Sequence, residues 1–144
     1  MAEMPQEIVD LINSVPLCYL ATATRSGIPD VAPVATAVAR DAGTILVAVT
    51  AQGKSATNIR ENARAALVVH STPPSGRQAS LASISQVRGA QIKGRAVVVA
   101  SGDHHEQARK RTVESLGPEA RDTFEATIVL QVEEIHSLVP QAGR

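Results

Sequence analysis

The sequence predicts a mainly β protein, an antiparallel sheet or barrel of six strands with three or four short helices. Short β-prone segments follow one another through turn-forming residues, as strands joined by hairpins do. Helical segments are too few to alternate with these strands, which disfavours a doubly wound parallel sheet. A chain of 144 residues with 44% hydrophobic and 19% charged side chains is expected to fold as one domain over residues 1–144.

The β-prone segments differ in the position they are expected to take in the sheet. The segment 31–40 contains Pro33, which cannot donate a backbone hydrogen bond, so this strand is expected at a sheet edge or at a bulge. Gly89 and Gly94 lie in the longest segment and indicate a bulge or a sharp bend there. The six expected strands cover residues 17–24, 31–40, 44–50, 65–71, 86–101 and 127–135.

Three helices are expected, with one more helical turn before the last strand. Residues 5–15 place apolar side chains at helical spacing. Ser55 is expected to cap a second helix that runs to Asn62. A polar helix over 103–116 ends at a Gly-Pro pair, and residues 72–85, rich in proline and serine, form a long loop that is either mobile or folded over a site.

The composition argues against several classes of function. Fourteen basic and fourteen acidic side chains cancel, so no net charge attracts nucleic acid or an anionic membrane. Tyr19 and Phe124 are the only aromatic residues, too few for a protein that stacks the bases of a single strand. The N-terminal segment is acidic and lacks a long apolar run, so we expect no signal peptide, no membrane anchor and a cytoplasmic location.

The cysteine and the histidines predict no metal site. Cys18, the single cysteine, lies in an apolar run and is expected to be a small buried side chain. His104 and His105 are neighbours on a polar helix, where adjacent side chains point about 100° apart, so both are expected at the surface. His70 and His136 have no further ligand at the spacing that a metal site needs.

The strongest chemical signal is the triplet Gly53-Lys54-Ser55, between a buried strand and a helix. Backbone N–H groups and the positive end of the helix dipole favour an anion at such a turn. Lys54 adds a charge, Ser55 adds a hydroxyl, and Asn58 lies one turn further along the helix. These groups predict a site for one terminal phosphate; the alternative is that Lys54 is a solvated surface residue and Ser55 only a helix cap.

The same triplet does not indicate a nucleotide triphosphatase. A P-loop needs a glycine five positions before its Gly-Lys-Ser, so that the backbone can wrap a phosphate. This chain has Ala48 at that position, inside an expected strand. No apolar strand ends in an aspartate placed to hold magnesium, and no G-x-S-x-G motif is present.

Four segments in order resemble a known family. They are LATATRSGIPDVAPVA, TILVAVT, GKSATNIRENARAALVV and VRGAQIKGRAVVV. The chain resembles the pyridoxamine-phosphate-oxidase-like flavin proteins, in which a Gly-x-Pro turn, a basic turn before a short helix, and a late strand with Gly-x-Ala follow one another. The resemblance covers residues 17–135 and implies a six-stranded antiparallel split β-barrel with Greek-key connections.

The resemblance also implies a homodimer that binds flavin mononucleotide (FMN) at the subunit interface. The strand facing the flavin ring would contribute Pro33, Val34, Ala35 and Thr36. The strand end near the ribityl chain would contribute Val49 and Thr50, and the phosphate ligands would be Lys54 and Ser55. Arg88 lies near a position that approaches the flavin from the partner subunit.

Two departures from the family limit the activity. Ala32 stands where many oxidases carry a phosphate-binding arginine, and the C-terminal Arg-x-His pattern of the true oxidases is missing. Oxidation of pyridoxamine phosphate is therefore not expected. The sequence predicts a flavin-dependent oxidoreductase that uses an unassigned small-molecule substrate or electron donor, with no acid or base that can be named. The alternatives are a flavin carrier without turnover, a relative that binds the deazaflavin F420 in place of FMN, and a barrel that binds no ligand.

Overall fold

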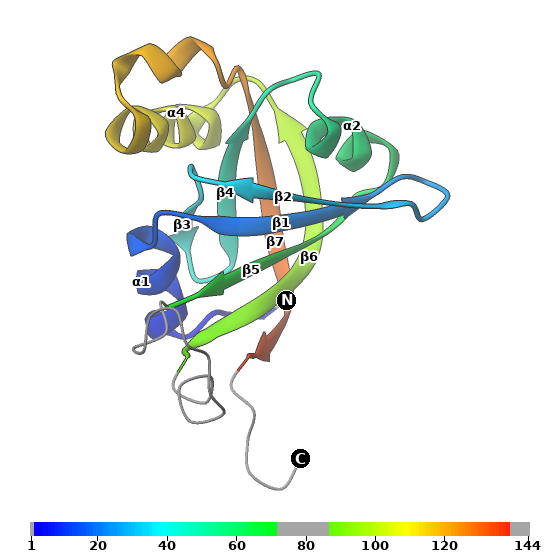
Figure 1. The fold of residues 1–144 in the computed structure, drawn as a ribbon, viewed down its shortest axis with the longest axis vertical. Helices are drawn as coiled ribbons and strands as arrows, with labels where there is room; N and C mark the ends of the chain where they lie inside the picture. Colours follow the sequence, from blue (N-terminus) through cyan, green and yellow to red (C-terminus); the bar gives the residue numbers. More distant parts are fainter. Residues whose placement is uncertain (1, 72–86, 139–144) are drawn as a thin grey trace, which may run out of the picture.

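The computed structural model describes residues 2–71 and 87–138, so the loop expected over 72–85 lies outside the described residues. These residues form one open antiparallel sheet of seven strands in the order β2-β1-β5-β6-β7-β4-β3 (Figure 1). The mainly β, antiparallel fold predicted from the sequence is confirmed. The strands are β1 (Cys18–Ala23), β2 (Pro29–Val34), β3 (Val38–Asp41), β4 (Thr44–Val49), β5 (Arg64–His70), β6 (Gly89–Val99) and β7 (Ala126–Ser137).

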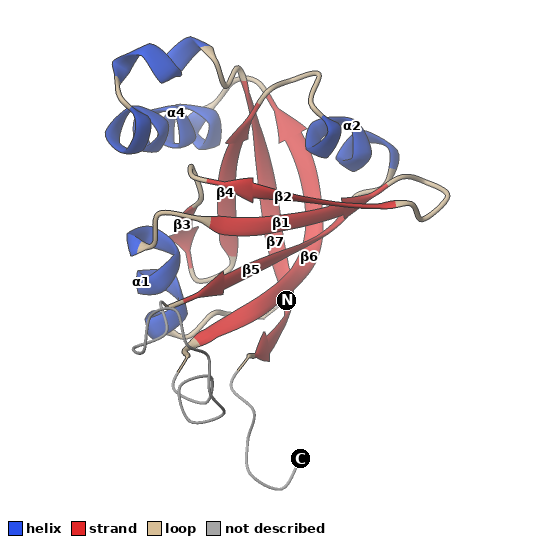
Figure 2. Cartoon of the chain, viewed as in Figure 1, coloured by secondary structure: helices blue, strands red, loops and turns tan. Residues whose placement is uncertain are grey.

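The helices lie around the sheet rather than between its strands (Figure 2). The helix α1 contacts β3, β5 and β6, α2 contacts β1, β2 and β6, and α4 contacts β4 and β7. A short 3-10 helix, η1, follows α4 and packs against it. Their bounds are Gln6–Ser14 for α1, Lys54–Glu61 for α2, Asp103–Leu116 for α4 and Pro118–Asp122 for η1.

The single strand predicted over 31–40 is wrong, because the segment forms two strands, β2 and β3. Pro33 does lie in an edge strand, as expected, since β2 pairs only with β1. After Val34 the chain leaves the sheet for residues 35–37, and the buried Thr36 donates its hydroxyl hydrogen bond to the Ala48 carbonyl at 2.9 Å. The sheet therefore has seven strands instead of six.

This break determines the shape of the sheet. The strands β2 and β3 are the two opposite edges of the sheet, yet only residues 35–37 connect them. The four residue steps from Val34 to Val38 span at most about 14 Å, so the two edges must lie close together. The sheet is rolled into a barrel that stays open along this seam, and Figure 1 shows β1 and β2 crossing β4 and β7.

The core fills the rolled sheet and continues under α4. Alternate residues of β1 and β5, such as Leu20 and Leu67, point into the main core, and Ile12 of α1 packs against them. β4 is buried on both faces, because Ile45 and Val47 face this core while Leu46 and Ala48 pack beneath α4. The strand that leads to the Gly-Lys-Ser turn is thus held from both sides. Cys18 is also buried, as expected.

The expected bulge in the long strand is present. The pairing of β6 with β7 shifts register between Lys93 and Gly94. A side chain at Gly94 has no room, because an added Cβ would lie 1.9 Å from the carbonyl oxygen of Gln131. Glycine is therefore required where β6 and β7 approach one another most closely.

The expectation that His105 lies at the surface is wrong. His105 is only 3% exposed, and its Nδ1 lies 2.8 Å from the hydroxyl of Thr127 on β7. Burial, with a further contribution from Arg109, lowers the pKa of His105 below its usual 6.5, although Glu106 opposes this shift. The polar residues around it in α4 conceal a buried position that helical periodicity alone does not reveal.

We expect His105 to make the stability of the fold depend on pH. Because its pKa is lower in the folded state, the unfolded chain binds the proton more tightly. The contribution of neutral His105 to stability is present above pH 6.5 and is lost as the pH falls below that value. His105→Gln should therefore reduce the fall in melting temperature between pH 7.5 and about 5.5. An identical pH dependence in the variant and the wild type would contradict this expectation.

Candidate functional site

A cavity of about 430 Å³ opens at the seam of the barrel, where β2, the end of β4 and the start of α2 meet. It is mainly apolar, and its lining includes most of the residues predicted from the sequence as cofactor ligands. The predicted residues that line it are Pro33, Val34, Ala35, Thr36, Val49, Thr50, Lys54 and Ser55. The structure thus brings together two segments that are separate in the sequence.

The turn between β4 and α2 is tightly built. The Gly53 N–H donates to the Thr50 carbonyl at 3.1 Å. A Cβ on Gly53 would lie 2.5 Å from the Thr50 hydroxyl oxygen, so glycine allows this approach. The Ala51 N–H donates to the Glu125 carboxylate, and the Ala51 carbonyl accepts from Arg60 at 2.6 Å. These contacts fix the start of α2 relative to the cavity.

The helix α2 begins two residues earlier than its predicted cap implies. Gly53, not Ser55, is its N-cap, and no side chain caps it. The first helical hydrogen bond runs from the Thr57 N–H to the Gly53 carbonyl at 3.0 Å. The N–H groups of residues 54–56 therefore have no partner within the helix, and these residues line the cavity. They are donors available to an anion.

Lys54 is the only basic residue among the described residues that line the cavity. Its side chain is exposed, and in the described part of the chain it makes no hydrogen bond or ion pair. Ser55 is 9% exposed, in the first turn beside it. One cation, a hydroxyl and free backbone donors together form a suitable anchor for a phosphate group.

Asn58, also predicted as a ligand, lies elsewhere. It is 1% exposed and does not line the cavity. Its Nδ2 donates to the hydroxyl of Thr22 on β1 at 3.0 Å, which ties α2 to the sheet. Asn58 lies one helical turn after Lys54, as expected, but its side chain is buried against β1 instead of facing the cavity.

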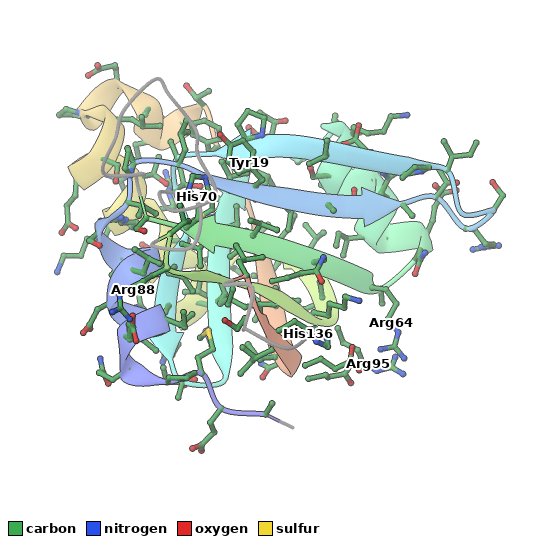
Figure 3. All side chains as sticks on the ribbon, turned by 60° about the horizontal axis from the view of Figure 1, so that its bottom comes forward. Tyr19, Arg64, His70, Arg88, Arg95 and His136 are labelled. Carbon is green, nitrogen blue, oxygen red and sulfur yellow. The ribbon has the colours of Figure 1, made fainter. Side chains whose placement is uncertain are left out.

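Arg88 also lies away from the cavity in this single chain. Figure 3 shows it beside α1, where its Nη1 pairs with Glu7 at 3.0 Å. It lines a different and smaller pocket of about 210 Å³. Its approach to a flavin from the partner subunit stays a prediction.

Seven of the described lining residues are absent from the predicted set of ligands: Leu17, Asp30, Ala32, Ala48, Gly53, Ala56 and Phe124. Asp30 lies on the same face of β2 as Ala32 and Val34, so alternation along the strand could have identified it. Leu17 precedes β1 and Phe124 follows η1. Nothing in the local sequence of these two residues indicates a site, because they reach the cavity only through the fold.

A larger hollow of about 580 Å³ lies on the outer face of the sheet, but it is a weaker candidate. Its lining residue Arg64 is neutralised by Glu133 at 2.7 Å, and Arg95 lies 3.6 Å from the same carboxylate (Figure 3). Lys93 lines this hollow as well, but its two cations are matched in number by the carboxylates of Glu133 and Glu134, and none of the predicted cofactor ligands lies there. We therefore take the seam cavity as the functional site.

The described residues offer no metal centre and no membrane span. Residues 2–71 and 87–138 contain no group of three or more histidine, cysteine or acidic side chains that could hold a metal ion. In the same ranges, no helix combines the length and the hydrophobicity required to cross a bilayer.

The family follows from a comparison with family models. The model of the pyridoxamine 5'-phosphate oxidase family matches residues 4–138. The chain belongs to this family. The match spans the whole described sheet, including both walls of the seam cavity. No curated protein matches the sequence closely enough to count as a relative.

Solved structures of similar fold carry names that refer to different cofactors. An FMN-binding protein from Syntrophomonas wolfei aligns with a TM-score of 0.71 and 14% identity over 94% of this chain and 89% of its own. HutZ, the heme storage protein from Vibrio cholerae, aligns with a TM-score of 0.67 and 18% identity over 92% of this chain and 92% of its own. An F420 reductase aligns with a TM-score of 0.63 and 19% identity over 92% of this chain and 98% of its own. At these identities the similarity establishes the split-barrel fold alone.

Proposed function

We propose that the seam cavity binds FMN, or the deazaflavin F420 in its place, by the phosphate group of the cofactor. We further propose that the protein is an oxidoreductase. The observation that carries this proposal is the unpaired Lys54 beside the free N–H groups of residues 54–56, at one side of an apolar cavity. A volume of about 430 Å³ is within the usual range for a cofactor pocket.

The residues present suit a flat ring as well as a phosphate. Pro33, Val34 and Ala35 give the cavity a wall of small and apolar side chains. The chain leaves β2 at this point, so backbone groups of residues 34–36 have no neighbouring strand on that side. They could hydrogen-bond a ring edge, and such bonds tune the electronics of a flavin.

When bound, the cofactor would supply the electron transfer itself. The chain's own part is to anchor, orient and shield it. Lys54 and Ser55 would hold the phosphate, Thr50 would approach the linking chain, and Phe124 would cover an apolar part of the ring. Lining residues that titrate near neutral pH are absent from the described cavity, so the chain's own part there would be to hold and orient the cofactor rather than to move a proton.

The heme-storage neighbour does not suggest heme in this cavity. A heme iron needs an axial ligand such as histidine, cysteine, methionine or tyrosine. None of these residues is among those that line the described cavity. The site therefore favours a ligand that is held by its phosphate.

The proposal is tested by titrating the purified protein with FMN and F420 while recording the absorption spectrum, and by the mass of any molecule that co-purifies. We expect a shifted flavin spectrum with saturation at micromolar concentrations. Turnover of added NADH or NADPH would separate an oxidoreductase from a flavin carrier. Absence of binding by either compound would overturn the proposal.

We further propose that the protein is a homodimer, joined through the outer face of β2, β1 and β5. This face carries the apolar residues Val31, Tyr19 and Val68. Pro33 pairs with Tyr19, and Val68 pairs with Tyr19 from the other side, so the apolar surface is continuous with the edge of the cavity. Tyr19 stacks on His70 with ring centroids 6.3 Å apart (Figure 3). A partner on this face would also border the cofactor.

Val31→Lys is expected to dissociate this dimer. Val31 is 69% exposed in the single chain, so the substitution should leave the fold intact while burying a charge at the interface. Ile28→Lys is the matched control, because Ile28 is 64% exposed but lies in the turn before β2. Size-exclusion chromatography with light scattering should give a monomer for Val31→Lys and a dimer for the control. A dimer in both variants would contradict this interface.

A further inference from the structure

The charged groups of the seam cavity are one cation and one anion. Among residues 2–71 and 87–138, Lys54 and Asp30 are the only charged residues that line it. They do not form an ion pair with each other, and in the described part of the chain neither side chain has a hydrogen-bond or ion-pair partner. The half-buried carboxylate of Asp30 therefore adds its negative charge to the cavity with no side-chain cation paired to it in the described residues.

The position of Asp30 places it on the side of the cavity nearest to α2. Asp30 of β2 pairs with Thr22 of β1, so the two side chains share one face of the sheet. Thr22 is buried on that face and accepts the hydrogen bond from Asn58 of α2. The carboxylate of Asp30 therefore faces the helix whose first turn carries Lys54.

The rest of that face adds no positive charge. Ala32 follows Asp30 on the same face and pairs with the buried Leu20. The remaining positive potential comes from Lys54 and from the start of α2, which acts as roughly half an elementary charge. With Asp30 ionised, the formal charges of the cavity walls cancel.

We infer that Asp30 makes the cavity select a cofactor whose phosphate group carries a single negative charge, as a phosphodiester does, over one with a doubly charged phosphomonoester. This inference rests on the proposed function and specifies the chemistry of its ligand. A phosphomonoester carries a charge of about −1.5 to −2 at pH 7, whereas a diester has no second ionisation. Lys54 can balance one charge, and Asp30 repels the second. The phosphate group of F420 is a phosphodiester and that of FMN is a phosphomonoester, so the two cofactors would place a different charge at the phosphate position beside Lys54.

The test uses three ligands with the same ring and tails of different charge. Riboflavin is uncharged, riboflavin 4′,5′-cyclic phosphate is a singly charged diester, and FMN is the doubly charged monoester. Each is titrated by fluorescence into the wild type, Asp30→Asn and Asp10→Asn. Asp10 is an exposed residue of α1 outside the cavity, so its variant controls for net charge. Melting temperatures verify that both variants are folded.

We expect Asp30→Asn to bind FMN roughly three- to tenfold more tightly than the wild type at low salt, with a smaller gain for the cyclic phosphate and none for riboflavin. The gain should shrink as salt is added. Asp10→Asn should behave as the wild type. An unchanged or weaker affinity for FMN, with riboflavin still bound, would overturn the role of Asp30 and leave the flavin site intact. An equal change for all three ligands would also overturn it. If no ligand binds to any of the proteins, the proposed function itself fails.

Discussion

Gly94→Ala is expected to destabilise the fold by about 3 kcal/mol or more. The added methyl group would lie 1.9 Å from the carbonyl oxygen of Gln131 and 3.2 Å from the Cδ1 of Leu130. Both contacts come from β7, the strand that pairs with β6 and β4 in the centre of the sheet. The methyl group cannot be accommodated unless β6 and β7 separate at their bulge, where the register shifts.

Urea denaturation of the two proteins measures this effect. Gly43→Ala is the matched control, because a Cβ there would lie no closer than 3.7 Å to any atom. The control should unfold within about 1 kcal/mol of the wild type. Similar midpoints for Gly94→Ala and Gly43→Ala would show that the sheet adapts to the extra atom and would contradict the close approach.

Lys54→Ala is expected to weaken the binding of FMN at least tenfold without unfolding the protein. A charge-assisted hydrogen bond to phosphate contributes roughly 1.5–3 kcal/mol, and each 1.4 kcal/mol is a factor of about ten in affinity. The side chain of Lys54 is exposed and has no partner in the described residues, so its removal leaves no other group unpaired. The melting temperature should therefore not change.

Two comparisons make this prediction specific. Lys110→Ala removes the same charge from the exposed side of α4, away from the cavity, and should leave the affinity unchanged. Riboflavin, which lacks the phosphate, should bind to Lys54→Ala and to the wild type equally well. Equal affinities of wild type and Lys54→Ala for FMN would remove Lys54 from the anchor.

Local patterns predicted most of the fold. Apolar, β-prone runs between turn-forming residues predicted β1, β4 and β5 to within about one residue at each end. The break at residues 35–37 could not be predicted in this way, because the small β-prone residues continue through it. What ends β2 is a tertiary contact, the hydrogen bond from Thr36 to the Ala48 carbonyl.

The site was predicted only where its chemistry is local. The turn at Gly53-Lys54-Ser55 could be predicted because its residues are contiguous in the sequence. The facing residues 33–36 were predicted from the family resemblance. Asp30 and Phe124 were not predicted, and they reach the cavity from other parts of the fold. Asn58 was predicted as a ligand but does not line the cavity. Its helical spacing from Lys54 is correct, but the contact with Thr22 turns it into the core.

The two-sided burial of β4 also has a consequence for synthesis on the ribosome. Every residue of this strand pairs with β7, from Thr44 with Gln131 to Val49 with Ala126. The nascent chain therefore contains most lining residues of the cavity long before the strand that holds one wall in place has emerged from the exit tunnel. Contacts between such distant segments form slowly, so the proposed cofactor can be captured only after β7 has emerged, and chains that stall before residue 126 should remain unloaded.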